Sequence, residues 1–484
     1  MKRIISFFKS ENQIEPIIKY EGLAKYMPLI ICGGFYLITI LLFIFGPFKW
    51  NITNEGNLYS FLFLALIALI IGYFLGVKIK RTKTKSCFNI NKIIYITFVI
   101  FIIMYIFNTY ATTGKFFPDV INGLFNSGEA YSTSHNLSSF STIIVYLGIL
   151  ISPITAFITP LFFIYYKNLS RTAKIFGVIV LVLNLFTGIA QGVINAYAIL
   201  AFQVIMFLLI YLFSNLKNKN WKSITKIVVL ILAIGISFIF YYKTVMGNRL
   251  IEDATSNENI VETEKNEEKE NTTETPENKN ETSNKFSNDE INDMFDGSAE
   301  YITQSTIKDK YILSFLPDSV ESSVNHIIGY ITHGYKGLAL AMTKDFTSSY
   351  GLGFSDFFRH NLLKVIGKSD IEDDIYSRTY MKKIEADGWV SGNVWSTFFI
   401  YPASDVGFPL TIILIFFIGF VFSLAWRDTL ESKNIFAAVV FINLCMIICF
   451  FCANNVYLQT GGSFMTIAIT GLLWIISRIF RKER

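Results

Sequence analysis

Ten apolar runs, each long enough to cross a lipid bilayer, limit most strongly what this 484-residue chain can fold into. A helix rises about 1.5 Å per residue, so about 20 apolar residues cross a hydrocarbon core of roughly 30 Å. With 52% hydrophobic and 16% charged residues, the sequence predicts an all-α polytopic membrane protein. The runs lie at about 27–46, 58–77, 93–110, 140–166, 172–188, 190–213, 223–242, 409–426, 434–453 and 463–479.

Lysine and arginine are divided unequally between the two sets of connections that these runs create. One set, which includes both termini, carries 24 of them, whereas the short connections of the other set carry only Lys49 and Lys115. Because basic connections stay in the cytoplasm, we expect both termini on the cytoplasmic side of a bacterial plasma membrane. The long loop should then lie on the outer side. The net charge of +5 then reflects contact with anionic lipid and not with nucleic acid. The basic stretches are 2–25, 78–92, 167–174, 217–226, 427–433 and 478–484.

One hydrophilic loop, from about Lys243 to Pro409, interrupts the apolar runs and changes composition along its length. Its residues 252–300 hold 16 acids against four lysines. Their few hydrophobic side chains cannot offset the cost of ordering the chain, so we expect a disordered spacer there. The predicted organisation is transmembrane helices 1–7 (1–242), an acidic disordered segment (243–300), a globular catalytic part of the loop (301–408), and helices 8–10 with a cytoplasmic tail (409–484).

The globular part of the loop begins with a short amphipathic helix. The apolar stretch Ile327–Met342 has 16 residues, which is short for a span and suits a re-entrant or interfacial helix. Helical spacing from about Glu321 places His326, Tyr330 and His333 on one face.

A second amphipathic helix is predicted to follow, capped by Ser355 or Asp356. Its polar side would carry His360, with Arg359 on the flank, turned to the aqueous side of the interface. A stripe of this kind more often serves packing than function. Its apolar members are Phe354, Phe358, Leu362 and Ile366.

The loop carries the residue types that chemistry on a lipid-linked diphosphate requires. An outward-facing loop has no access to ATP or nucleotide sugars, so its activated donors are mostly diphosphates carried on lipid. Arginine binds phosphate oxygens with two parallel hydrogen bonds, and aromatic rings stack on sugars. For each single cation a solvated charge is the alternative. The candidate cations are Arg249, Arg359, Arg378 and Lys336, and the candidate aromatic residues are Tyr330, Tyr335, Tyr350, Tyr380, Trp389 and Trp395.

A base that takes the proton from an acceptor hydroxyl is the remaining requirement. His333 and His360 are the candidate bases of the loop, and the alternative for each is a hydrogen-bonded helix residue. Asp405 precedes the eighth span at the membrane edge, where a lipid-linked substrate would lie.

Other kinds of site are not indicated by the sequence. The acidic run "DIEDD" (370–374) lacks the fixed spacing of a cation site and is better interpreted as a solvated turn. Cys445, Cys449 and Cys452 share a helical face without nearby acidic or histidine partners. No phosphate-binding glycine loop or nucleotide fingerprint is present, so we expect neither a metal nor a cofactor.

Two segments of the loop resemble a known family. They are "YITHGYKGLALAMTKDFTSSYGLGFSDFF" (Tyr330–Phe358) and "GNVWSTFFIYPASDVG" (Gly392–Gly407). They resemble the large-loop pattern of bacterial oligosaccharide repeat unit polymerases, the Wzy-type enzymes of capsule, exopolysaccharide and O-antigen assembly. The resemblance covers roughly residues 320–425, and the rest of the chain is similar in topology and hydropathy only.

The resemblance implies a metal-independent, GT-C-like glycosyltransferase that joins oligosaccharide repeats carried on undecaprenyl diphosphate. Arg249 and Arg359 would match the arginines that hold the diphosphate, and His333 would match the loop histidine. We expect Arg378 to assist the two arginines in neutralising the departing diphosphate, His333 or Asp405 to act as the base, and His360 to assist. A flippase and a chain-length regulator would be its partners. One departure is that many relatives have a Gly-Gly-Arg-like turn where this chain has Gln191.

Two other functions stay open at this point. A polysaccharide ligase of the same superfamily would transfer finished chains to a different acceptor. A flippase or transporter would need paired charges or broken helices near the membrane midplane. The spans contain no Asp, Glu, Lys or Arg well inside, and Pro153, Pro160, Asn184 and Asn195 are the polar or kinking features considered for such a role. This pattern argues against transport.

Overall fold

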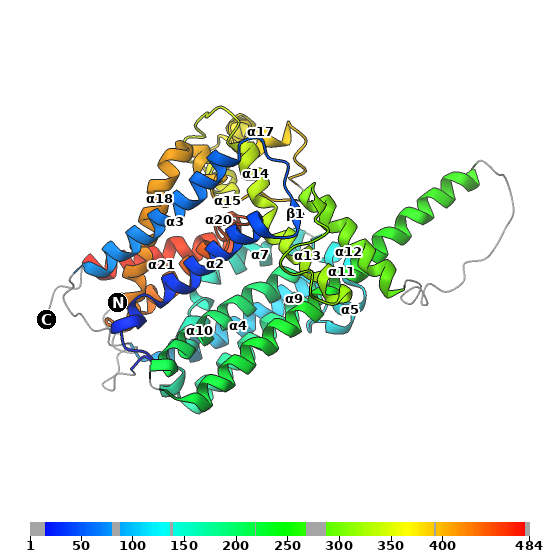
Figure 1. Cartoon of the computed structure of the whole chain (residues 1–484). Coiled ribbons are helices and arrows are strands. Elements are labelled where there is room, and N and C mark those ends of the chain that lie inside the picture. Colours follow the sequence, from blue (N-terminus) through cyan, green and yellow to red (C-terminus); the bar gives the residue numbers. More distant parts are fainter. Residues whose placement is uncertain are drawn as a thin grey trace.

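The structure is a computed structural model that describes residues 15–79, 88–135, 139–217, 219–267, 287–391 and 394–479. Within these ranges, nine helical segments are long and apolar enough to cross a membrane, which confirms a multi-pass, all-α membrane protein (Figure 1). The segments are Met27–Phe45, Glu55–Lys78, Ile90–Thr113, Ser141–Asn168, Arg171–Ala190, Ile194–Leu216, Trp221–Ile251, Ile400–Leu430 and Gly461–Ile479.

The long helices form the body of the molecule. The fourth span is broken into two helices, α7 and α8, and the predicted tenth span, 434–453, is a helix of only 15 residues, α19. Nearly all of α19 is buried by its neighbours, as expected for a helix that is apolar on every side. The helices are α2 (Met27–Phe45), α3 (Glu55–Lys78), α4 (Ile90–Thr113), α7 (Ser139–Thr155), α8 (Ile158–Tyr165), α9 (Arg171–Ala190), α10 (Ile194–Lys217), α11 (Trp221–Glu267), α18 (Ile400–Leu430), α19 (Ile435–Cys449) and α21 (Gly461–Ile479).

Glycines allow α3 and α18 to pack backbone against backbone. A Cβ atom at Gly72 would collide with the carbonyl of Phe416, and one at Gly419 would collide with the carbonyl of Leu69. Small residues at such positions let membrane helices approach closely and gain dispersion contacts. Figure 1 shows the two helices side by side along one flank.

The connections that the sequence assigns to one face meet at one end of the bundle, which we call the loop end. There the short strand β1 (Phe48–Lys49), between α2 and α3, pairs antiparallel with β2 (Thr306–Ile307) of the long loop. Near the start of α21, the Asn455 and Gln459 side chains both donate to the carbonyl of Phe354.

The basic connections meet at the opposite end, which we call the basic end. The Lys433 Nζ atom lies 2.6 Å from a carboxylate oxygen of Glu15, and the Asn168 side chain donates to the Glu15 carbonyl. The Trp426 indole donates to the carbonyl of Ala24. The grouping of connections into two sets therefore agrees with the sequence prediction.

The long loop is more ordered than the sequence suggested. Residues 288–300, expected to be disordered, belong to helix α12 (Asn288–Thr303), and α11 continues to Glu267. Ser287 and Glu290 form a capping box at the start of α12, and Phe295 and Ala299 are fully buried. The start of the folded part of the loop therefore moves from 301 to 287, and residues 268–286 lie outside the described residues.

The rest of the loop folds into short helices over the loop end (Figure 1). The predicted helix over 327–342 is two helices that meet at His333, α13 (Asp318–Thr332) and α14 (Gly334–Ala341). The eighth span begins earlier than predicted, at Ile400, and is kinked at Gly407, which has a φ of 79°. The remaining helices are α5 (Val120–Phe125), α6 (Ser127–His135), α15 (Asp356–Val365), α16 (Glu372–Ser377), α17 (Tyr380–Glu385) and α20 (Val456–Gln459).

Candidate functional site

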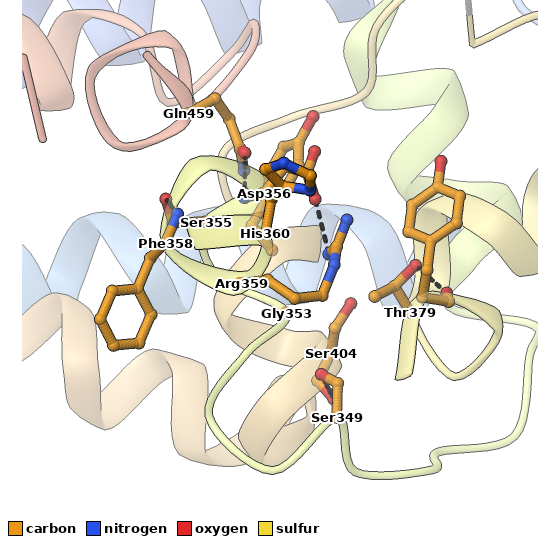
Figure 2. Close-up of polar contacts among 12 residues, drawn as sticks. Ser349, Gly353, Ser355, Asp356, Phe358, Arg359, His360, Thr379, Ser404 and Gln459 are labelled. Carbon is orange, nitrogen blue, oxygen red and sulfur yellow. Dashed lines mark hydrogen bonds and ion pairs between the residues drawn. The ribbon is translucent and has the colours of Figure 1, made fainter. Parts of the chain in front are cut away.

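Arg359 on α15 is the centre of a polar cluster in the described part of the loop (Figure 2). Its side chain is nearly buried, although the sequence placed it on a flank. Its Nη1 atom lies 2.6 Å from a carboxylate oxygen of Asp356, and its Nε atom lies 3.8 Å from one of Glu372. The guanidinium also stacks over the Tyr376 ring, with 4.9 Å between its Cζ atom and the ring centroid. Helix α15 thus presents a desolvated arginine held by two carboxylates.

His360 follows Arg359 and shares its partner Glu372. Its Nδ1 atom lies 3.1 Å from the second carboxylate oxygen of Glu372, and its side chain is 53% exposed. A carboxylate on Nδ1 orients an imidazole ring and leaves Nε2 free to take a proton. Glu372 therefore joins a cation and an oriented, accessible base.

Helix α15 takes this position because of its cap and its buried face. The Ser355 hydroxyl accepts the Phe358 N–H, as predicted for one of two possible caps. The buried residues are Arg359 and Leu363, one turn apart, whereas Ile366, predicted in the apolar stripe, is 56% exposed. The predicted apolar stripe did not include the buried face of α15 correctly, because the prediction gave Arg359 no role in packing.

Asp405 does not present a free carboxylate. One of its oxygens accepts hydrogen bonds from the Ser349 hydroxyl (2.6 Å) and the Gly353 N–H (2.9 Å). Its other oxygen accepts from the Phe354 N–H (2.9 Å). The geometry therefore argues against the predicted role as a base. Asp405 fixes the turn from which α15 starts.

His333 lies in a closed aromatic cluster and cannot reach a substrate in this structure. Its Nδ1 atom lies 3.1 Å from the Gly329 carbonyl oxygen, and its ring lies 5.0 Å from Trp395 and 6.5 Å from Trp389 between centroids. Burial lowers the pKa of His333 to about 4, so the ring is neutral. The burial of His333 argues against its predicted role as a base, whereas His360, predicted to assist it, is exposed.

The other predicted ligands are divided between structural and surface positions. Tyr335 is fully buried and its hydroxyl lies 2.8 Å from that of Thr39 on α2, so it is a packing residue. Lys336 donates to the carbonyls of Thr303 and Gln304, and burial lowers its pKa.

Arg378 and Tyr350 form a surface pair near α15. Arg378 donates to the Tyr350 hydroxyl at 2.9 Å and forms an ion pair with Asp374 at 2.8 Å. Tyr350 lies in the left-handed region with a φ of 60° and is 69% exposed. The acidic run 370–374 thus neutralises two arginines, through Glu372 and Asp374, and is not simply a solvated turn.

Arg249 lies apart from this cluster, beside a turn between α9 and α10. It donates to the carbonyl of Gly192 and stacks 4.5 Å from the centroid of the Tyr131 ring. Burial raises the pKa of Tyr330 to about 12, and the positive charge of Arg249 partly opposes this effect. Gln191, which stands where relatives have an arginine, donates to the Thr112 hydroxyl at 2.9 Å.

The predicted residues therefore form three groups and not one. The first is Arg359 and His360 on α15, with Arg378, Tyr350 and the Asp405-bound turn beside them. The second is the aromatic cluster, in which Tyr330 lies edge to face with Trp395 at 4.2 Å. The third is Arg249, which lies near enough to Tyr330 of the second group for its charge to act on that hydroxyl. Sequence reasoning missed Asp356, Glu372 and Tyr376; the spacing of Asp356 and Arg359, three residues apart on one helix, was a usable signal.

Two cavities lie elsewhere, inside the helix bundle. These adjoining cavities, of about 450 and 310 Å³, share Phe101, Ser152, Thr155, Asn184 and Ala196 in their walls. None of the predicted site residues lines either of them. In the described part of the chain, no three His, Cys, Asp or Glu side chains are grouped as metal ligands.

The comparisons with known proteins give a membrane family only. Residues 137–304 match a family described as "Predicted membrane protein (DUF2232)", which covers less than half of the chain. No curated protein and no solved structure matches the chain. The match agrees with the multi-pass architecture, and the chemistry has to be argued from the residues.

Proposed function

We propose that this protein is a glycosyltransferase of the outer face of the bacterial plasma membrane, which polymerises oligosaccharide repeats carried on undecaprenyl diphosphate. The observation that carries the proposal is the cluster of Arg359, Glu372 and His360 on and beside α15. It combines a desolvated cation with an oriented, exposed base at the loop end of a membrane bundle. The resemblance of residues 320–425 to Wzy-type polymerases supports the same chemistry.

The proposed step needs one base and one anion-binding group. The acceptor sugar hydroxyl attacks the anomeric carbon of the donor, while the bond from that carbon to the diphosphate oxygen breaks. His360 takes the hydroxyl proton on Nε2, and Arg359 stabilises the charge of the departing lipid diphosphate. The energy comes from the loss of the diphosphate, so no nucleotide is consumed.

Exchange of ion-pair partners would let Arg359 receive the diphosphate. Asp356 is half exposed and can turn to water, which frees the Nη1 side of the guanidinium. A diphosphate offers several oxygens and binds arginine in a bidentate manner, which a single carboxylate oxygen at 3.8 Å does not. Arg378 and Tyr350, next to this site, would hold part of the sugar chain.

Conservative substitutions test the proposal. In cells that depend on this protein for polymer, His360→Asn should shorten the chains severely, because asparagine cannot accept the proton. Arg359→Lys should also impair the step, since lysine lacks the two-pronged geometry. We expect a fall in polymerisation rate of 100-fold or more for His360→Asn, as is usual on losing a general base, about 10²–10⁴. Polymer length is read on a gel at matched protein level.

His333→Asn serves as the control for the reassigned base. Asparagine can keep the hydrogen bond to the Gly329 carbonyl, so this variant should retain polymerisation whenever it folds. Chains of normal length from both His360→Asn and Arg359→Lys would refute the proposed site. Loss of activity in His333→Asn with full thermal stability would return the base to His333.

A transporter or flippase is a second candidate, because the fourth span is broken beside a polar cavity. Helix α7 ends at Thr155 and α8 begins at Ile158, and residues around this break line the larger cavity. Broken helices at such cavities are typical of transporters. If the protein is a transporter, its deletion would make unpolymerised repeats collect on the inner face of the membrane.

A polysaccharide ligase is the third candidate. If the protein is a ligase, its deletion would leave the chains on the lipid carrier at normal length but not attached to their final acceptor.

A further inference from the structure

The two adjoining cavities lie within the transmembrane bundle, share part of their walls, and are lined by both apolar and uncharged polar side chains. The larger has a volume of about 450 Å³, in the range of small-molecule sites. Its walls come from helices far apart in sequence, α4, α7–α10, α19 and α21. Among the described residues that line the two cavities, none is Asp, Glu, Lys, Arg or His. The polar residues that line them include Tyr105, Asn108, Thr109, Thr155, Asn184 and Gln191.

The cavities extend from the loop end to about half the depth of the bundle. Gln191 and Gly462 lie at the loop ends of α9 and α21 and line their upper part. Val180 lies about ten residues further along α9, which corresponds to a depth of roughly 15 Å. The cavities therefore lie in the half of the bundle nearer the loop end.

Several polar groups of the wall lack partners within the described protein. Buried oxygen atoms of Tyr105, Asn108 and Thr109 make no hydrogen bond, and Thr109 is completely buried. Buried polar groups without partners are costly, which indicates that a ligand or water satisfies them.

The chemistry of the wall selects an uncharged ligand that both donates and accepts hydrogen bonds. A phosphate or ammonium group would lose its hydration without meeting an opposite charge, which is expensive in this environment. Amides and hydroxyls match the many hydroxyls of a saccharide, and the Phe101 and Tyr105 rings, 5.7 Å apart, offer faces for sugar stacking.

We propose that these adjoining intramembrane cavities bind an uncharged, polyhydroxylated group, a neutral saccharide. The inference does not rest on the proposed function, because binding requires neither Arg359 nor His360. The same chemistry could come from a free glycan or from the headgroup of a neutral glycolipid. The two sources differ in how the ligand is presented, and the experiment separates them.

The test measures binding to the full-length protein in lipid nanodiscs. Radiolabelled maltotriose represents the free neutral glycan, and diglucosyl diacylglycerol in the nanodisc represents the glycolipid. We expect saturable binding of at least one probe. Asn184→Leu, which removes the amide shared by both cavities, should weaken it about tenfold, the effect of one or two hydrogen bonds.

Matched variants make the result decisive. Asn215→Leu makes the same change outside the cavity, on the basic side of α10, and should bind like the native protein. Thr155→Val keeps the side-chain shape and should weaken binding if Asn184→Leu fails to fold. His360→Asn should bind normally even if it is inactive. The proposal is overturned if neither probe saturates, if only a charged lipid binds, or if Asn184→Leu and Thr155→Val both bind like Asn215→Leu.

Discussion

Asp405 and Glu372 are carboxylates that lie on either side of the same short helix, α15, and differ in what occupies their oxygens. Asp405 accepts hydrogen bonds from two backbone N–H groups and one hydroxyl, so its carboxylate oxygens are occupied in holding a turn. Glu372 faces two ionisable side chains, Arg359 and His360. A carboxylate that binds backbone is part of the scaffold, whereas one that binds exchangeable side chains can take part in chemistry. Residue type alone does not separate the two cases.

Asp405→Asn tests the structural role at the residue scale. An amide has one acceptor oxygen, and its NH₂ group would face a backbone N–H. We expect a loss of about 2 kcal/mol in the free energy of unfolding, in the range for an unsatisfied buried donor. The thermal midpoint of the purified protein measures this. A variant as stable as the native protein but without activity would instead support the base that the sequence predicted. Asp370→Asn, at an exposed position of the short 3₁₀ helix Ser369–Ile371, is the control.

At the scale of elements, periodicity predicted most helices but not their breaks. The face with His326, Tyr330 and His333 formed as predicted, with neighbouring rings 6.5 and 6.1 Å apart. The break at His333 was missed because α14 packs between the ends of the spans. There the Tyr335 hydroxyl forms a hydrogen bond with the Thr39 hydroxyl of α2. This is a tertiary contact that no local pattern contains. The Arg359 cluster was missed for the same reason, since Glu372 belongs to another helix.

Helix α12 gives a prediction at this scale. Its acidic composition indicated disorder, although the capping box and the buried Phe295 and Ala299 were visible signals of a helix. Phe295→Ala should cost about 3–5 kcal/mol of stability, as for other buried phenylalanines. Deletion of residues 270–284, which leaves α11 and α12 whole, should preserve expression and the thermal midpoint. Equal midpoints for Phe295→Ala and the native protein would show that α12 adds nothing to the fold.

At the scale of the whole molecule, charge distribution predicted which connections lie together. At the loop end, the pairing of β1 with β2 and the contacts of Phe354 hold together the connections that have few lysines and arginines. At the basic end, the ion pair between Lys433 and Glu15 holds together the lysine- and arginine-rich connections. Positions of lysine and arginine carry this information because each span reverses the chain direction. The interior cavity was not predictable in the same way. Its wall combines isolated polar residues of seven helices, each of which alone is an ordinary feature of a span.

The orientation of the bundle is the prediction on which the proposed chemistry depends. In a Cys87→Ser background, Lys310→Cys at the loop end and Lys222→Cys at the basic end place single exposed thiols at opposite ends. Because basic connections stay in the cytoplasm, Lys310→Cys should react with a membrane-impermeant maleimide in intact cells. Lys222→Cys should react only after the cells are opened. Labelling in the reverse order would place the Arg359 cluster in the cytoplasm, away from outward-facing lipid-linked repeats, and the proposed polymerase would then be excluded.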